Sequence, residues 1–301
     1  MTKHAKRLSE WAMSAPSIFW LTLFFVVPTM LVVAISFHAA APDGGIGKEW
    51  TLHTWRSISN PNYPAIIWRT LWISAATTVG CVILALPCAF AIARMDKKWR
   101  AFMAGLIMLP FWTSFVVRVF AWRLLLHPEG FVKHLLLAMR LTQPDTQLLY
   151  NSGAILLVSI YSFLPFAIMP IYAAAEKFDF SLLEAARDLG ARSFLAFRKV
   201  FLPGIRRGVI SAILMVFIPS VGSYVIPDLV GGKNSELIGN KIYQRTFPDR
   251  NLPHASALSA LMAFAVLIPL ALVAAALKRQ DRKEALRLAD GNPVKQRGGA
   301  A

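Results

Sequence analysis

Six stretches of mainly apolar residues, each about twenty residues or longer, dominate this sequence. Five of them contain no Asp, Glu, Lys or Arg, and the sixth, 101–126, contains only Arg118 and Arg123. A helix of about 20 apolar residues crosses a hydrocarbon layer of ~30 Å, so each stretch is long enough to span a membrane. The five uncharged stretches are 17–37, 70–93, 148–175, 208–227 and 254–277.

The composition indicates the same class of protein. The chain is 56% hydrophobic and 16% charged, whereas soluble domains average about 45–50% apolar and about 25% charged residues. We therefore expect an all-α polytopic membrane protein, with residues 1–301 forming one transmembrane domain of six helices. The expected helices are about 17–37, 67–93, 101–126, 148–175, 206–229 and 254–277.

Basic residues are divided unevenly between the two sides of this arrangement. If the N-terminus is cytoplasmic, the segments on that side hold 21 of the 32 Lys and Arg residues, and the opposite segments hold 10. Lys and Arg favour the cytoplasmic side, so we expect both termini in the cytoplasm and the chain in the inner membrane of a bacterial cell. The net charge is +16, and we assign the basic tails to contacts with anionic lipids of the bilayer rather than to nucleic acid.

The segment 176–205 is expected to be the one long cytoplasmic loop. Ser181 and Glu184 have the spacing of a capping box, in which each side chain accepts a hydrogen bond from the backbone N–H of the other residue. Gly190 suits the left-handed position that follows a helix end. The loop is therefore predicted to contain a short helix of about eight residues, followed by a second short helix that ends at 202–204.

Two interpretations of the first short helix arise from its residues. Capping and composition alone fit an interfacial amphipathic helix that has no protein partner. The order Glu-Ala-Ala, three residues, Gly, then Leu-Pro instead resembles the EAA loop of ABC-importer permeases. That resemblance implies that the helix docks in a cleft of an ATPase subunit. The matching residues are Glu184, Ala185, Ala186, Gly190, Leu202 and Pro203.

The nucleotide-binding pattern G-x-x-x-x-G-K-[ST] does not occur in the sequence. We therefore expect ATP hydrolysis on a separate ATP-binding cassette subunit. The chain itself is expected to be no enzyme, to bind no cofactor and to break no covalent bond.

Two membrane segments resemble the spermidine/putrescine permease family. They are 110–122 and 219–232, with 238–240 after the second. The resemblance implies the type I importer permease fold, a second homologous permease, two ATPases and a periplasmic solute-binding protein. It also implies inward transport of a small organic solute, such as spermidine or putrescine, by alternating access. One departure is Phe180, where many relatives carry Pro.

Other functions remain alternatives at this point. The same architecture could import another solute, such as an amino-acid conjugate, a phosphonate or a thiamine-like compound. Two rivals come from other classes. A secondary transporter or channel would not need a docking helix in its main cytoplasmic loop, and an intramembrane enzyme would need a pair of catalytic carboxylates, which no span contains.

Arg118 and Asp228 are the charged residues that most need an explanation. A charge inside a transmembrane helix costs roughly 2.5–3.5 kcal/mol near the centre of the span, so Arg118 is expected to face the bundle and to be paired. It either clamps a carboxylate, for which Asp228 is a candidate, or a helix C-terminus, or it lies on the substrate pathway. Asp228 either fills that role or meets an incoming ammonium group.

Three aromatic residues are candidates for a cation-binding pathway. Trp112, Tyr161 and Tyr224 could contact a substrate ammonium through their rings, at about 0.5–2 kcal/mol per contact. The alternative is that they anchor helix ends at the membrane interface. The six histidines show no paired metal spacing on one helix, so no metal site is expected.

Overall fold

The computed structural model describes residues 13–58, 62–268 and 271. Within it the chain divides into two units. The larger unit is 56–250, and the terminal unit combines 1–55 with 251–301.

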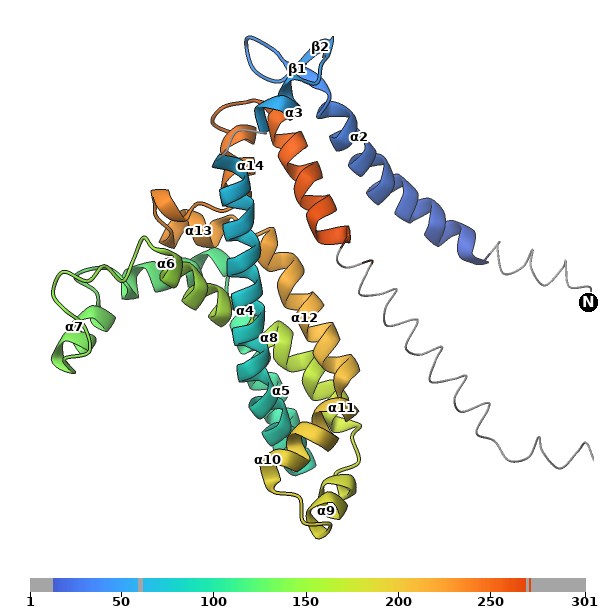
Figure 1. Cartoon of the computed structure of the whole chain (residues 1–301), viewed down its shortest axis with the longest axis vertical. Helices are drawn as coiled ribbons and strands as arrows, with labels where there is room; N and C mark the ends of the chain where they lie inside the picture. The colour runs from blue at the N-terminus through green and yellow to red at the C-terminus, as the bar shows by residue number, and fades with distance from the viewer. Residues whose placement is uncertain (1–12, 59–61, 269–270, 272–301) are drawn as a thin grey trace, which may run out of the picture. The chain divides into compact units, whose positions relative to one another are not determined.

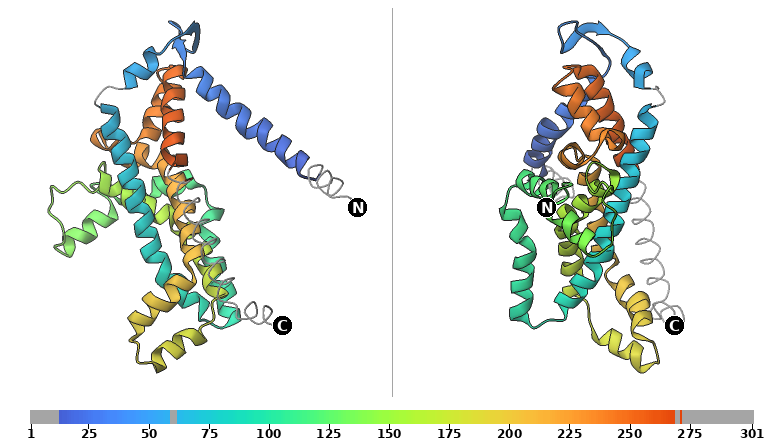
Figure 2. Two further views of the ribbon diagram at one scale, coloured as in Figure 1. Left: turned by 45° about the vertical axis from the view of Figure 1, so that its right-hand side comes forward. Right: turned by 90° about the vertical axis from the view of Figure 1, so that its left-hand side faces the viewer.

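Three long helices form the bundle of the larger unit (Figures 1 and 2). They are α4 (Asn62–Ala93), α8 (Ser152–Glu176) and α12 (Arg206–Val221). Small buried residues line their contacts, including Ala85, Ala89, Ala167 and Ala212. Small side chains allow helix backbones to approach closely in a membrane. At Gly208 a Cβ would lie 2.5 Å from Ala174 Cβ, so the contact of α12 with α8 requires glycine there.

The expected helix 101–126 is broken in the structure. It consists of α5 (Lys97–Met108), the 3₁₀ turn η2 (Leu109–Trp112) and α6 (Phe115–Leu125). The two halves are bent by 86°. Thr113 is extended, and its hydroxyl donates to the carbonyl of Pro110 at 2.8 Å. This hydroxyl donates to a carbonyl that has lost its helical donor at the break. Because the two halves are bent and separated by extended residues, the prediction of a single continuous helix was wrong. In the right-hand view of Figure 2 α5 lies at the side of the bundle, to which Arg100 ties it by an ion pair with Glu176 of α8 at 3.3 Å.

The expected helix 206–229 is also interrupted. α12 ends at Val221, and α13 (Val225–Val230) begins after a three-residue break. The backbone N–H groups of Gly222 and Ser223 still bond to the last turn of α12. Pro227 lies inside α13; it has no backbone N–H, and its ring would clash with the carbonyl of Ser223 if the helix continued unbroken from α12. The membrane helix therefore stops eight residues before the expected end.

Short elements occupy the two ends of the larger unit. At one end lie α9 (Ser181–Asp188), α10 (Ser193–Ala196), the π turn η3 (Phe197–Phe201) and α11 (Leu202–Gly204). At the opposite end lie η4 (Lys233–Ser235), α14 (Ile238–Thr246) and the start of α4 (Figure 1). α7 (Phe131–Ala138) belongs to the segment between α6 and α8.

The terminal unit contains two apolar helices and a hairpin. The first helix covers Met13–Ile35 and includes the π turn η1 (Thr22–Val26) and α2 (Val27–Ile35). β1 (His38–Ala40) and β2 (Ile46–Trp50) pair antiparallel, and α3 (His53–Ile58) follows them. The last helix covers Leu252–Ile268. The remainder of the expected helix 254–277 lies outside the described residues, apart from residue 271.

Three helices of the described chain are long and apolar enough to cross a membrane individually, and the number rises to five when each bent pair counts as one. The shorter apolar helix Leu252–Ile268 corresponds to the sixth expected span. The prediction of a helical membrane protein is confirmed.

Candidate functional site

α9 is the helix predicted in the loop 176–205. Its expected capping box is wrong, because Phe180 already has helical φ and ψ and Ser181 lies inside the first turn. The Ser181 N–H instead donates to Oδ1 of Asp179 at 3.0 Å. Hydrogen bonds from the hydroxyl and the backbone N–H of Ser181 lower the pKa of Asp179. The carboxylate of Asp179, rather than that of Glu184, therefore satisfies the start of this helix.

The expected end of α9 is confirmed. Gly190 has φ +86°, in the left-handed region that glycine adopts without a Cβ penalty. Its N–H donates to the carbonyl of Arg187 at 2.8 Å, and the N–H of Ala191 donates to that of Ala186 at 3.0 Å. These two bonds form a Schellman motif, which stops α9 and turns the chain toward α10.

The outer face of α9 is open to a partner. Glu184, Ala185 and Gly190 are exposed and Ala186 is half-buried, while Leu183 is buried beneath them. Large apolar side chains that the EAA pattern did not indicate extend this surface. Leu182 is 51% exposed, Leu189 90% and Phe194 75%. Apolar side chains this exposed on a polar loop are typical of an interaction surface. The sequence could have indicated them, because the loop contains more large apolar residues than its own small core can bury. Leu202 and Pro203 begin α11 instead.

A cluster of five phenylalanines, here called the Phe cluster, attaches this surface to the bundle. Phe201 has no exposed surface, and its ring centroid lies 4.9 Å from that of Phe90 in α4. Most rings of the cluster meet edge to face, at 4.9–6.0 Å, a geometry worth about 0.5–1.5 kcal/mol per pair beyond burial. Phe180, the departure from the family pattern, is one of its members. The cluster is Phe90, Phe178, Phe180, Phe197 and Phe201.

Arg118 and Asp228 do not clamp each other. The guanidinium carbon of Arg118 lies 5.6 Å from the ring centroid of Phe111 and 5.9 Å from that of Phe115. Asp228 is exposed on α13. In the described part of the chain no ion pair joins the two residues, and Nε of Arg118 is buried without a hydrogen-bond partner. The pairing hypothesis is therefore wrong for the isolated chain.

The three candidate pathway aromatics lie in separate places. Trp112 is 87% exposed at the break before α6. Tyr161 packs edge to face on Trp122 at 5.3 Å, and Tyr224 stacks on Tyr243 at 5.2 Å. Over the described residues, none of the three contacts another of the three. A cage of these three rings is not formed by this chain alone.

Comparisons with known proteins place these features in context. Residues 82–285 match the family described as binding-protein-dependent transport system inner membrane component. The chain is 34% identical to the spermidine/putrescine transport system permease protein PotB of Haemophilus influenzae, over 80% of this chain and 84% of that protein.

Solved structures show the same fold. A bacterial ABC transporter involved in the import of the acidic polysaccharide alginate has a chain that matches with a TM-score of 0.65 at 18% identity, over 92% of this chain and 98% of that chain. A second structure, of bacterial alginate ABC transporter in complex with alginate pentasaccharide-bound periplasmic protein, matches with a TM-score of 0.61 at 19% identity, over 88% and 93%.

Proposed function

Because this chain belongs to the family of inner-membrane components of binding-protein-dependent transport systems and is a permease subunit of an ABC importer, we propose that it carries a polyamine such as spermidine or putrescine into the cell. The identity of 34% to a spermidine/putrescine permease over most of both chains supports this cargo. Another small solute, such as an amino-acid conjugate, a phosphonate or a thiamine-like compound, is the alternative.

The surface of α9 is the observation that carries the coupling part of the proposal. Its exposed Glu184–Ala185 edge is assigned to the cleft of an ATPase subunit, together with the exposed apolar side chains beside it, Leu182, Leu189 and Phe194. The Phe cluster joins this surface to α4 through Phe90. Closure of the ATPase pair on ATP would move α9, and the Phe cluster would transmit that movement to the bundle. ATP hydrolysis belongs to the separate subunit, and this chain binds no cofactor.

A second, homologous permease is proposed to complete the membrane domain. Arg118 supports this assignment, because its half-buried side chain has no carboxylate partner among the described residues and can take an acceptor from a neighbouring subunit. None of the residues of α5 or η2, both fully described, is buried. Their apolar faces therefore remain available to a neighbouring subunit and to lipid.

The proposed orientation of the chain in the membrane follows from the uneven division of its Lys and Arg residues. Both termini and α9 lie in the cytoplasm, whereas α14, η4 and the start of α4 face the periplasmic binding protein. Trp112, Arg118, Tyr161, Tyr224 and Asp228 are retained as candidate pathway residues. A polyamine would meet the carboxylate of Asp228 at the outer end, and the aromatic side chains would follow.

Reconstitution of the complete transporter tests the cargo. The two permeases, the ATPase and the binding protein are incorporated into liposomes, and ATP-dependent uptake of labelled spermidine and putrescine is compared with uptake of a phosphonate and of thiamine. Saturable polyamine uptake that requires ATP and the binding protein is expected. Uptake of a different solute, with none of either polyamine, would contradict the polyamine assignment and leave the permease assignment intact.

A further inference from the structure

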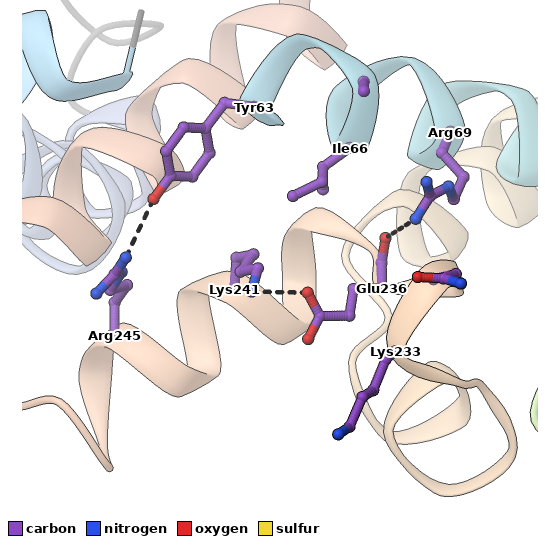
Figure 3. A pocket seen from close by; sticks show the side chains of 9 residues that line it. Tyr63, Ile66, Arg69, Lys233, Glu236, Lys241 and Arg245 are labelled. Carbon is purple, nitrogen blue, oxygen red and sulfur yellow. Dashed lines mark hydrogen bonds and ion pairs between the residues drawn. The ribbon is translucent and has the colours of Figure 1, made fainter. Parts of the chain in front are cut away.

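A polar pocket of about 510 Å³ lies where the start of α4 meets η4 and α14. Figure 3 shows the side chains around it. Basic residues from three separate segments reach this pocket, and the carboxylate of Glu236 lies among them. The basic residues are Arg69 of α4, Lys233 of η4, and Lys241 and Arg245 of α14.

Two of the four positive charges are already paired. Nζ of Lys241 lies 2.6 Å from a carboxylate oxygen of Glu236, whose other oxygen accepts from the amide of Gln244 at 3.3 Å. Arg245 forms an ion pair with Asp249 at 2.8 Å and donates to the hydroxyl of Tyr63 at 3.4 Å. Glu236 and Asp249 are therefore both engaged on the α14 side of the pocket.

The other two positive charges have no carboxylate partner within the described part of the chain. Arg69 donates only to the backbone carbonyl of Glu236, at 3.3 Å, and Lys233 is exposed at the rim. Arg69 supplies five N–H donors in a fixed planar fork, which matches the two oxygens of a carboxylate. The pocket thus carries two excess positive charges and a geometry suited to an anionic group.

We propose that this pocket receives an acidic side chain of the periplasmic binding protein when that protein docks on the transporter. The inference rests on the proposed function, which places η4, α14 and the start of α4 on the outer side. The positive charge of the pocket repels a free polyamine, so the pocket is a docking site and not a station on the substrate pathway. It also draws an acidic surface toward the transporter before contact.

The position of the pocket on α4 indicates that its anionic ligand comes from a protein and not from a lipid. Trp68 and Trp72 lie one turn apart and are 71% and 65% exposed, as expected for tryptophans at a membrane interface. Arg69 lies ~80° around the helix from this tryptophan stripe. The pocket therefore opens on a different flank of α4 from the one that the tryptophans direct toward lipid.

The test measures docking of the substrate-loaded binding protein on the assembled transporter. The transporter is placed in nanodiscs of phosphatidylcholine alone, and both the Kd of the binding protein and its half-saturating concentration for ATPase stimulation are determined. Lys233→Gln and Arg69→Gln are expected to raise both values about tenfold and to weaken their dependence on salt. Lys48→Gln, a matched exposed lysine in β2, is expected to leave both values near those of the unaltered transporter.

The outcomes of these measurements distinguish failure of the pocket proposal from failure of the proposed function. Lys233 is exposed, so Lys233→Gln keeps the test valid even if Arg69→Gln lowers the yield of folded transporter. Wild-type docking by both pocket variants would overturn the proposal. An effect of the variants that appears only in discs containing anionic phosphatidylglycerol would also overturn it, in favour of a lipid phosphate. Pocket-dependent docking without any ATPase stimulation would support the pocket and contradict the proposed function, whereas no docking by the unaltered transporter would contradict both.

Discussion

Gly190 turns the chain at the end of α9 with φ +86°, and a Cβ built on it meets no atom within 4 Å. Space is therefore available for a side chain, and only the backbone conformation opposes one. A left-handed residue with a Cβ costs roughly 1 kcal/mol, and asparagine tolerates this region better than other residues do.

Two replacements of Gly190 distinguish an effect of the left-handed backbone conformation from an effect of added side-chain volume. Gly190→Val is expected to shift α9 and to reduce both co-purification of the ATPase and ATP-dependent uptake. Gly190→Asn fills the same open space and is expected to retain most of both, because its backbone keeps the left-handed conformation. Equal losses for the two variants would show that the side-chain volume, and not the conformation, matters here.

Arg118 is expected to behave independently of Asp228. A double-mutant cycle on the melting temperature of the complex, with Arg118→Ala and Asp228→Ala, should be additive within about 0.5 kcal/mol. A second cycle with Phe111→Leu should reveal coupling of about 0.5–1 kcal/mol, from the contact of the guanidinium with the ring. Strong coupling to Asp228 would mean that the assembled transporter pairs two side chains that form no ion pair in the single chain.

The helix α9 depends on its attachment as well as on its own exposed face. Its eight residues are too few for an isolated helix to be stable in water. The Phe cluster supplies the missing stability, because it packs the loop against α4 at Phe90. Two phenylalanines of this region therefore have distinct expected roles, one inside the cluster and one on the surface.

Phe201→Ala and Phe194→Ala form a matched pair that tests these roles. Phe201 is fully buried and Phe194 is 75% exposed. Removal of a buried phenylalanine ring costs about 3–5 kcal/mol, so Phe201→Ala should lower the melting temperature of the permease itself. Phe194→Ala should leave that temperature unchanged and should weaken retention of the ATPase. The reverse pattern would contradict the assignment of the two side chains.

The two broken membrane helices place their charged residues away from a straight span. The 86° bend before α6 directs Arg118 toward the rings of η2 and α6. The break at 222–224 leaves Asp228 on a short separate helix. Breaks of this kind occur in membranes where backbone groups find partners in protein, and here the hydroxyl of Thr113 is such a partner.

The topology of the entire chain is testable by labelling of single cysteines. In a background with Cys81→Ser and Cys88→Ser, Ser181→Cys on α9 is expected to react only with a reagent that enters the cytoplasm. Glu49→Cys on β2, an exposed position, is expected to react from outside in intact cells. Labelling of Glu49→Cys only after permeabilisation would invert the orientation inferred from the division of basic residues.

The sequence by itself determined the class of the protein, and it predicts six spans and a coupling loop at 176–205. These features depend on local properties, namely apolar length, charge bias and the spacing from Glu184 to Gly190. Local spacing was not sufficient for the start of α9, because the helical conformation of Phe180 moved the cap from Ser181 to Asp179.

Only the tertiary structure decided the partners of the individual side chains. The Phe cluster joins Phe90 to Phe201, and the basic pocket joins Tyr63 to Arg245 across 182 residues of sequence. Such contacts arise from the packing of helices that are distant in the chain, and no periodicity or motif encodes them. For the same reason the pairing of Arg118 with Asp228 could be suggested from their charges, but within the described chain the two side chains form no ion pair, although α6 and α13 pack against each other.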